Sequence, residues 1–172
     1  MEALSKRINS LPVSATLAMA AKARELKNQG IDIIGLSLGE PDFNTPEFIK
    51  QAAIQAVNDN WNSYSPVDGY ADLKEAICEK FKRDNKLSYQ PSQIVVSTGA
   101  KQSIANVCMV LLDPGDEVLL PAPYWVSYSA IATLAEAKSI IIPSSIETDF
   151  KITPEQLEAA ITPRTKLIMF NS

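Results

Sequence analysis

Short apolar runs alternate with segments of helical periodicity along the second half of the chain. The apolar runs predict buried strands, at residues 94–96, 117–120, 139–142 and 167–170. The segments between them carry apolar residues at helical spacing and predict helices, at residues 102–112, 125–137 and 153–161. Strands that are apolar on both faces and are separated by helices are typical of a mostly parallel sheet. The pattern therefore predicts an α/β fold.

The first half of the chain has a more helical pattern. Periodic apolar positions predict three helices, at residues 14–28, 45–58 and 71–84. A short apolar run predicts a strand at residues 31–38. Thr45 is expected to cap the second helix, because Pro46 suits a first helical position and Glu47 complements the helix dipole. An aromatic-containing loop at residues 60–69 is expected to lead into the third helix.

Composition narrows the chemistry more than the fold. The 172 residues contain no histidine, which excludes Ser-His-Asp and Cys-His catalysis and histidine-containing zinc sites within this chain. A net charge of −4 without a basic cluster disfavours nucleic-acid binding. No apolar run is long enough to span a membrane, and residues 1–10 lack the apolar core of a secretory signal. Cys78 and Cys108 lie in apolar helical stretches and are expected to be reduced, which favours the cytoplasm.

One segment has the pattern of a phosphate-binding turn. Residues 97–102, with the sequence STGAKQ, join a predicted strand to a predicted helix, and Gly99 permits a sharp turn. The first amide groups of a helix lack partners within the helix, and the helix dipole favours an anion there. About twenty residues later, the sequence PAPYW presents the large aromatic ring of Trp125. A phosphate-binding turn followed by a flat ring suits a phosphorylated planar cofactor.

Each of these features also has a structural interpretation. Residues 97–102 alone fit an ordinary strand–helix turn equally well, and Trp125 alone fits a core residue better. Gly39 could serve only a turn, and Tyr64 could be a surface tyrosine. The combination of the turn, the tryptophan and Gly39 favours the cofactor interpretation.

Five segments together resemble the class I aminotransferases of fold type I, which use pyridoxal phosphate (PLP). The segments are SLGEPDF at 37–43, YSP at 64–66 with Gly69, STGAKQ at 97–102, DPGDE at 113–117 and PAPYW at 121–125. The bacterial and plastid-type aspartate aminotransferases, some of which also transaminate prephenate, are the most similar subgroup. The resemblance implies a three-layer α/β/α fold with a mostly parallel sheet. It also implies an N-terminal arm and small-domain segment at residues 1–45 and part of the PLP-binding large domain at residues 46–172.

The resemblance implies a role for particular residues. The cofactor phosphate would be bound by the backbone N–H groups of Gly99, Ala100 and Lys101. Trp125 would lie against the cofactor ring and the substrate, and Gly39 would present its backbone to the substrate carboxylate. Tyr64 would reach the phosphate in a neighbouring subunit, because such active sites lie at a homodimer interface. Asn171 would begin the loop that carries a substrate-binding asparagine.

The reactive residues of the family fall outside this chain. Its aldimine-forming lysine is expected beyond Ser172, so the chain is expected to be a truncated and inactive N-terminal portion. The full-length protein is expected to transfer amino groups between amino acids and 2-oxo acids, with aspartate and 2-oxoglutarate as its substrates. One alternative is a non-catalytic fragment that binds phosphate or PLP. The others are an aminotransferase that acts on prephenate, aromatic amino acids or alanine, and a PLP-dependent lyase on the same fold.

Overall fold

The structure is a computed structural model that describes residues 4–36 and 39–171. The chain forms two compact units, which are described separately. The first comprises Met1–Leu38 and Ala100–Ser172 and is called the sheet unit. The second, Gly39–Gly99, is called the helical unit. Within the described residues, no helix is long and apolar enough to cross a membrane.

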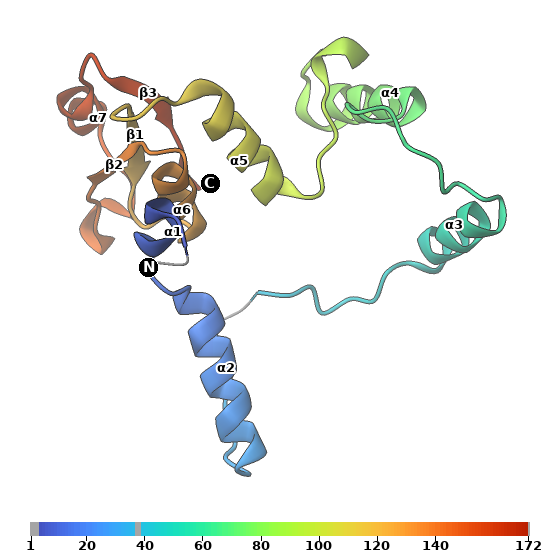
Figure 1. Cartoon of the computed structure of the whole chain (residues 1–172), viewed down its shortest axis with the longest axis horizontal. Helices are drawn as coiled ribbons and strands as arrows, with labels where there is room; N and C mark the ends of the chain where they lie inside the picture. The colour runs from blue at the N-terminus through green and yellow to red at the C-terminus, as the bar shows by residue number, and fades with distance from the viewer. Residues whose placement is uncertain (1–3, 37–38, 172) are drawn as a thin grey trace. The chain divides into compact units, whose positions relative to one another are not determined.

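The sheet unit is built around a parallel three-stranded sheet (Figure 1). The central strand β1 (Glu117–Pro121) pairs with β2 (Lys138–Ile142) and with β3 (Thr165–Ile168), both in parallel. The pairing with β3 shifts register between Glu117 and Val118. The first four residues of β1 are buried, as expected for a strand with neighbours on both sides. Three of the four strands predicted for the second half of the chain are therefore confirmed.

Helices cover both faces of this sheet. Val118 and Leu120 of β1 pack in one cluster with residues of α5 (Ala100–Leu111) and α6 (Ser127–Leu134). Leu119, which points to the opposite face, lines a hollow together with Leu157 of α7 (Pro154–Ala160). This alternation separates the helices into two layers, so the predicted α/β/α arrangement is present.

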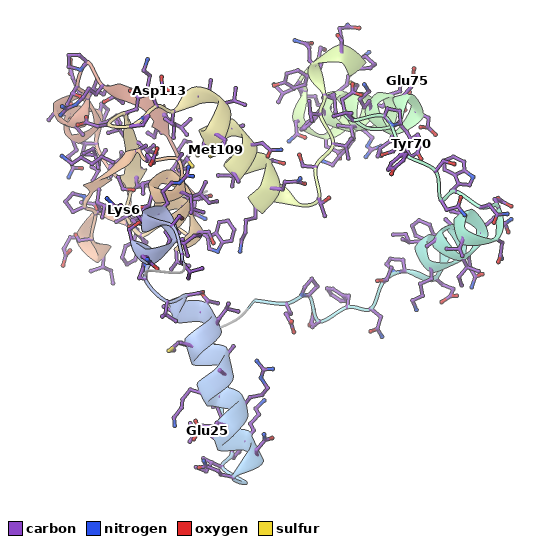
Figure 2. The ribbon with its side chains drawn as sticks, in the orientation of Figure 1. Lys6, Glu25, Tyr70, Glu75, Met109 and Asp113 are labelled. Atoms are coloured by element: carbon purple, nitrogen blue, oxygen red, sulfur yellow. The ribbon has the colours of Figure 1, made fainter. Side chains whose placement is uncertain are left out.

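Local sequence signals set the ends of these helices. The Thr153 hydroxyl accepts from the N–H of Gln156 at the start of α7, as its capping-box spacing predicts. After α5, the N–H of Asp113 donates to the Asp116 carboxylate and closes the turn before β1. Figure 2 shows Asp113 in this turn, and Met109, which is exposed on α5.

The N-terminal part of the sheet unit is helical. A short helix α1 (Lys6–Asn9) contacts α6, and α2 (Ala15–Asn28) follows it. The predicted helix at 14–28 is confirmed, with the Ser14 hydroxyl accepting from the N–H of Leu17. A 3₁₀ turn, η3 (Ile146–Thr148), lies later in the sheet unit, between β2 and α7.

The helical unit contains the helices predicted for residues 45–58 and 71–84. Its elements are α3 (Glu47–Asn58), α4 (Ala71–Lys80), a π-helical turn η1 (Phe81–Asn85) and a 3₁₀ turn η2 (Pro91–Gln93). Edge-to-face aromatic pairs join Trp61 to Tyr70 and Phe81 to Tyr89, with ring centroids 5.6 and 5.5 Å apart. Tyr70 directly precedes α4 (Figure 2).

Two predicted strands and one predicted cap are wrong. Residues 31–36 and 94–96 form no strand; residues 37–38 lie outside the described part of the chain. An apolar run shows that a segment is suited to burial, but a strand also needs a neighbour to bond its backbone. At the second segment, the N–H of Val96 donates to the carbonyl of Asp68, 3.1 Å away. Thr45 does not cap α3, because the N-cap position falls on Pro46.

A buried carboxylate joins β1 to the turn before β3. Glu117 is 2% exposed, and its two oxygens accept from the Thr162 hydroxyl at 2.6 Å and the Arg164 guanidinium at 3.1 Å. The pKa of Glu117 lies below its ordinary value of 4.5. The hydrogen bond from Thr162 is the largest cause of this lowering and Arg164 adds to it, whereas burial acts in the opposite direction. Glu117 begins β1, so this network lies at the amino end of the strand and serves the fold.

The stability of the sheet unit is expected to fall in acid through Glu117. A carboxyl group with a lowered folded-state pKa stabilises the fold above its unfolded-state pKa, and this contribution is lost as the pH falls through the folded-state pKa, below 4.5. In a full-length protein that contains this chain, Glu117→Gln should lower the thermal midpoint at pH 7 and flatten its decline in acid. The control Glu158→Gln changes an exposed carboxylate on α7 and should do neither. An unaltered acid decline in Glu117→Gln would contradict this role.

Gly69 is expected to tolerate no side chain. A Cβ atom added there would lie 2.5 Å from Cγ2 of Val96, and the residue has a φ of +101°. Gly69→Ala should therefore destabilise the helical unit by about 1–3 kcal/mol through overpacking alone. Faster hydrogen exchange of the Val96 amide would report this loss. In the double variant Gly69→Ala/Val96→Ala the two costs should be less than additive, because alanine removes Cγ2, the nearer of the two Val96 atoms at 2.5 and 2.8 Å, and so relieves part of the clash; strict additivity would refute the contact.

Candidate functional site

The carboxyl ends of the three parallel strands meet at one edge of the sheet. Functional loops in α/β proteins lie at this edge. The segment that follows β1 carries Trp125, and it is held on both sides by the chain that follows the neighbouring strands. The N–H of Ala122 donates to the carbonyl of Ile142 at 2.9 Å, and the Ser144 hydroxyl donates to the carbonyl of Ala122. On the other side, the N–H of Trp125 donates to Oδ1 of Asn171 at 3.1 Å.

Trp125 lies before α6 rather than within a helix, which corrects the helix predicted at residues 125–137. Trp125 is 37% exposed, and its indole packs edge-to-face with the Tyr128 ring, with centroids 5.6 Å apart and planes at 89°. The ammonium group of Lys101 lies 4.9 Å from the indole centroid. The start of α5 and the tryptophan are therefore neighbours, although 24 positions separate them in the sequence.

The turn before α5 has the backbone expected of an anion-binding turn. Gly99 adopts a φ of +85°, and no atom lies within 4 Å of the position that a Cβ atom would take. The helix begins at Ala100, two residues earlier than the sequence pattern predicts. The amides of Ala100 and Lys101 consequently belong to the first turn, where no carbonyl of the same helix can accept from them.

Gly99 is the last residue of the helical unit, and two other predicted site residues also belong to that unit. Tyr64 is fully exposed, and Gly39 is exposed with open space around its Cα atom. Residues 37 and 38, which precede Gly39 in the motif, lie outside the described part of the chain. The structure therefore brings Lys101 and Trp125 together and describes Tyr64 and Gly39 separately from them.

A hollow of about 570 Å³ opens beside Lys101. One side is formed by the chain that leads into α2, including Leu11, Val13 and Ser14, and the other by Tyr124 and residues of α6. Nothing in the sequence pattern connects these two segments, because the hollow depends on α1 contacting α6. The N-terminal segment is therefore part of the surroundings of Lys101 that sequence reasoning missed.

Asn171 and Ser144 are also functional candidates that sequence reasoning missed in these roles. Each is a polar residue soon after a strand, which is the available signal, but the pattern does not reveal which backbone group it bonds. The described residues contain no cluster of three or more histidine, cysteine, aspartate or glutamate side chains that could hold a metal ion. Cys108 is buried, and its burial raises the pKa of the thiol. The available chemistry is thus that of backbone amides, an ammonium group and an aromatic ring.

The residues beside Trp125 fit a group with a phosphate at one end and a flat ring at the other. The first-turn amides of α5 and the Lys101 ammonium group suit a phosphate dianion. The partly exposed Trp125 offers a surface for a planar ring. PLP has both parts.

Comparisons with known proteins identify the family of the chain. A family model described as aminotransferase class I and II matches residues 31–172. The aspartate/prephenate aminotransferase of Nitrosomonas europaea is 53% identical over 98% of this chain, and the aspartate aminotransferase of Bacillus subtilis is 51% identical over 98%. Both alignments cover 43% of the relative.

A solved structure shares the fold. The aspartate aminotransferase of Thermus thermophilus with maleate matches with a TM-score of 0.92 and 43% identity, over 98% of this chain and 44% of that one. The chain therefore spans less than half the length of the relatives that it matches. Since the family model covers most of the chain and the fold agrees, the chain belongs to the class I and II aminotransferase family.

Proposed function

We propose that a full-length protein containing this chain is a PLP-dependent aminotransferase that exchanges amino groups between aspartate and 2-oxoglutarate. The observation that carries this proposal is the meeting of Lys101, at the start of α5, with the Trp125 ring, 4.9 Å from its ammonium group. The names of the relatives support aspartate as the amino donor. The lysine that reacts with PLP is proposed to lie in a segment that these 172 residues do not contain and that corresponds to the uncovered part of the relatives. The 172-residue chain by itself is therefore proposed to be inactive.

The proposed work of these residues is to bind and orient. The backbone N–H groups of Gly99, Ala100 and Lys101 donate to the phosphate, helped by the positive end of the α5 dipole. Trp125 restricts the tilt of the cofactor ring and keeps water from one face. PLP itself supplies an electron sink for the bonds at the substrate carbon. Precise orientation matters, because an error of about 1 Å can cost roughly a hundredfold in rate.

The contact between Lys101 and the indole does not block this arrangement. A cation–π contact at an exposed site is worth only about 0.5–1 kcal/mol, so the flexible side chain can leave the ring when a better partner is present. A charge-assisted hydrogen bond to a phosphate is worth more, about 1.5–3 kcal/mol. The ammonium group therefore adds positive charge near the phosphate without occupying the ring surface.

Two residues of the helical unit are also proposed to contact a ligand. Gly39 presents its backbone to the substrate carboxylate, and the exposed Tyr64 reaches the phosphate in the second subunit of a homodimer. Residues 1–45 then belong to the arm and small domain, and residues 46–172 to the large domain. The free thiols of Cys78 and Cys108 support a cytoplasmic location. Prephenate is a second proposed amino acceptor, supported by the name of the Nitrosomonas relative.

The aminotransferase proposal predicts a spectroscopic cycle. The full-length protein loaded with PLP should show a visible absorbance band of bound cofactor, which aspartate removes and 2-oxoglutarate restores. Alanine should remove it more slowly if aspartate is the preferred donor. The isolated 172-residue chain should show no turnover. A cofactor-loaded full-length protein without an aspartate-dependent change would refute the proposed activity.

The phosphate-binding turn predicts a specific effect of Gly99→Ala. The added methyl group would occupy the open space and strain a residue with a φ of +85°. Loss of one charge-assisted hydrogen bond would raise the dissociation constant for PLP about ten- to a hundredfold. Equilibrium dialysis against PLP would measure it.

Gly115→Ala is the matched control for this variant. Gly115 has a φ of +90° and also has open space around it. It lies in the turn before the amino end of β1, whereas Trp125 follows the carboxyl end of that strand. It should therefore show similar backbone strain with unchanged PLP affinity. Equal weakening in both variants would show that Gly99 acts only through the fold.

A further inference from the structure

The segment between β1 and α6 is held by side chains that come from outside it. Asn171, which follows β3, accepts from the N–H of Trp125 through Oδ1 at 3.1 Å. The Ser144 hydroxyl, which follows β2, donates to the carbonyl of Ala122. The two tethers thus come from opposite sides of β1 and end on two different residues of the same segment.

The Asn171 tether acts directly on the residue that carries the indole. Trp125 precedes α6, so its N–H has no acceptor within that helix. Its carbonyl accepts from the N–H of Tyr128 at 2.9 Å. With both backbone polar groups bonded, rotation about the Trp125 backbone is restricted, and so is the direction of its Cα–Cβ bond. The edge contact with Tyr128 then limits the remaining rotation of the ring.

The Ser144 tether acts three residues earlier. Between Ala122 and Trp125 lie Pro123 and Tyr124, so a change at Ser144 reaches the indole only through two intervening residues. The two tethers therefore differ in function although both stabilise the segment. The donor in the first tether is a backbone N–H, so any replacement for Asn171 must offer an oxygen acceptor at the same reach.

We infer that Asn171 is a positioning residue, which sets the orientation of the Trp125 indole through its hydrogen bond to the Trp125 backbone. The consequence for cofactor binding rests on the proposed function: an indole held in one orientation presents one flat surface to the PLP ring. The orientation itself is a property of the protein without cofactor. Its measurement therefore stands whether or not PLP binds.

The test uses the full-length protein labelled with 5-fluorotryptophan. The Trp125 fluorine resonance is identified by its absence in Trp125→Phe and is recorded first without cofactor. Asn171→Leu, which keeps the volume but removes the acceptor, should shift and broaden this resonance. Asn171→Asp, which keeps an oxygen acceptor, should restore it. Ser144→Ala should lower the thermal midpoint but leave the resonance in place.

Cofactor affinity provides the second measurement. Since an aromatic stack is worth about 0.5–1.5 kcal/mol, Asn171→Leu should raise the dissociation constant for PLP about two- to tenfold. An unchanged Trp125 resonance in Asn171→Leu would overturn the inference, as would a Ser144→Ala variant with the same shift. If Asn171→Leu does not fold, Asn171→Ala makes the same comparison. Failure of the wild-type protein to bind PLP would refute the proposed function, and the fluorine measurement would still decide the role of Asn171.

Discussion

The structure of the sheet unit depends on the central position of β1. This strand is hydrogen-bonded in parallel on both sides, and side chains from its two faces enter different helical layers. Because all three strands run in one direction, their carboxyl ends reach the same edge, where segments far apart in sequence become neighbours. The tethering of Trp125 by Asn171 follows from this arrangement, whereas the contact of Trp125 with Lys101 depends on the packing of α5.

The two ends of β1 carry polar groups of different kinds. At the amino end, Glu117 is buried and receives hydrogen bonds from Thr162 and Arg164, which offset the cost of removing a carboxylate from water. This network joins the strands. At the carboxyl end, the polar groups of Ser144 and Asn171 bond to the backbone of a loop instead. The first end stabilises the sheet, and the second restrains a segment whose aromatic ring stays accessible.

The contacts around Trp125 differ in strength in a way that suits ligand binding. The backbone of the tryptophan is bonded at both its N–H and its carbonyl, whereas Lys101 covers the ring through a weak contact. A ligand can therefore displace the lysine side chain without disturbing the backbone that orients the ring. The ring is therefore already oriented before a ligand binds, and little binding free energy is spent on ordering it.

The sequence by itself determined the helices other than the short α1, three of the strands and the parallel α/β class, because periodicity, caps and turn residues act locally. The pattern at residues 97–102 and the position of Trp125 also predicted the two halves of the candidate site. It did not reveal that residues 31–36 and 94–96 form no strand, because strand pairing needs a neighbour that local sequence does not specify. Only the tertiary structure decided that Lys101 lies over Trp125 and that Asn171 bonds its backbone, since both contacts depend on how β1, β3 and α5 pack together.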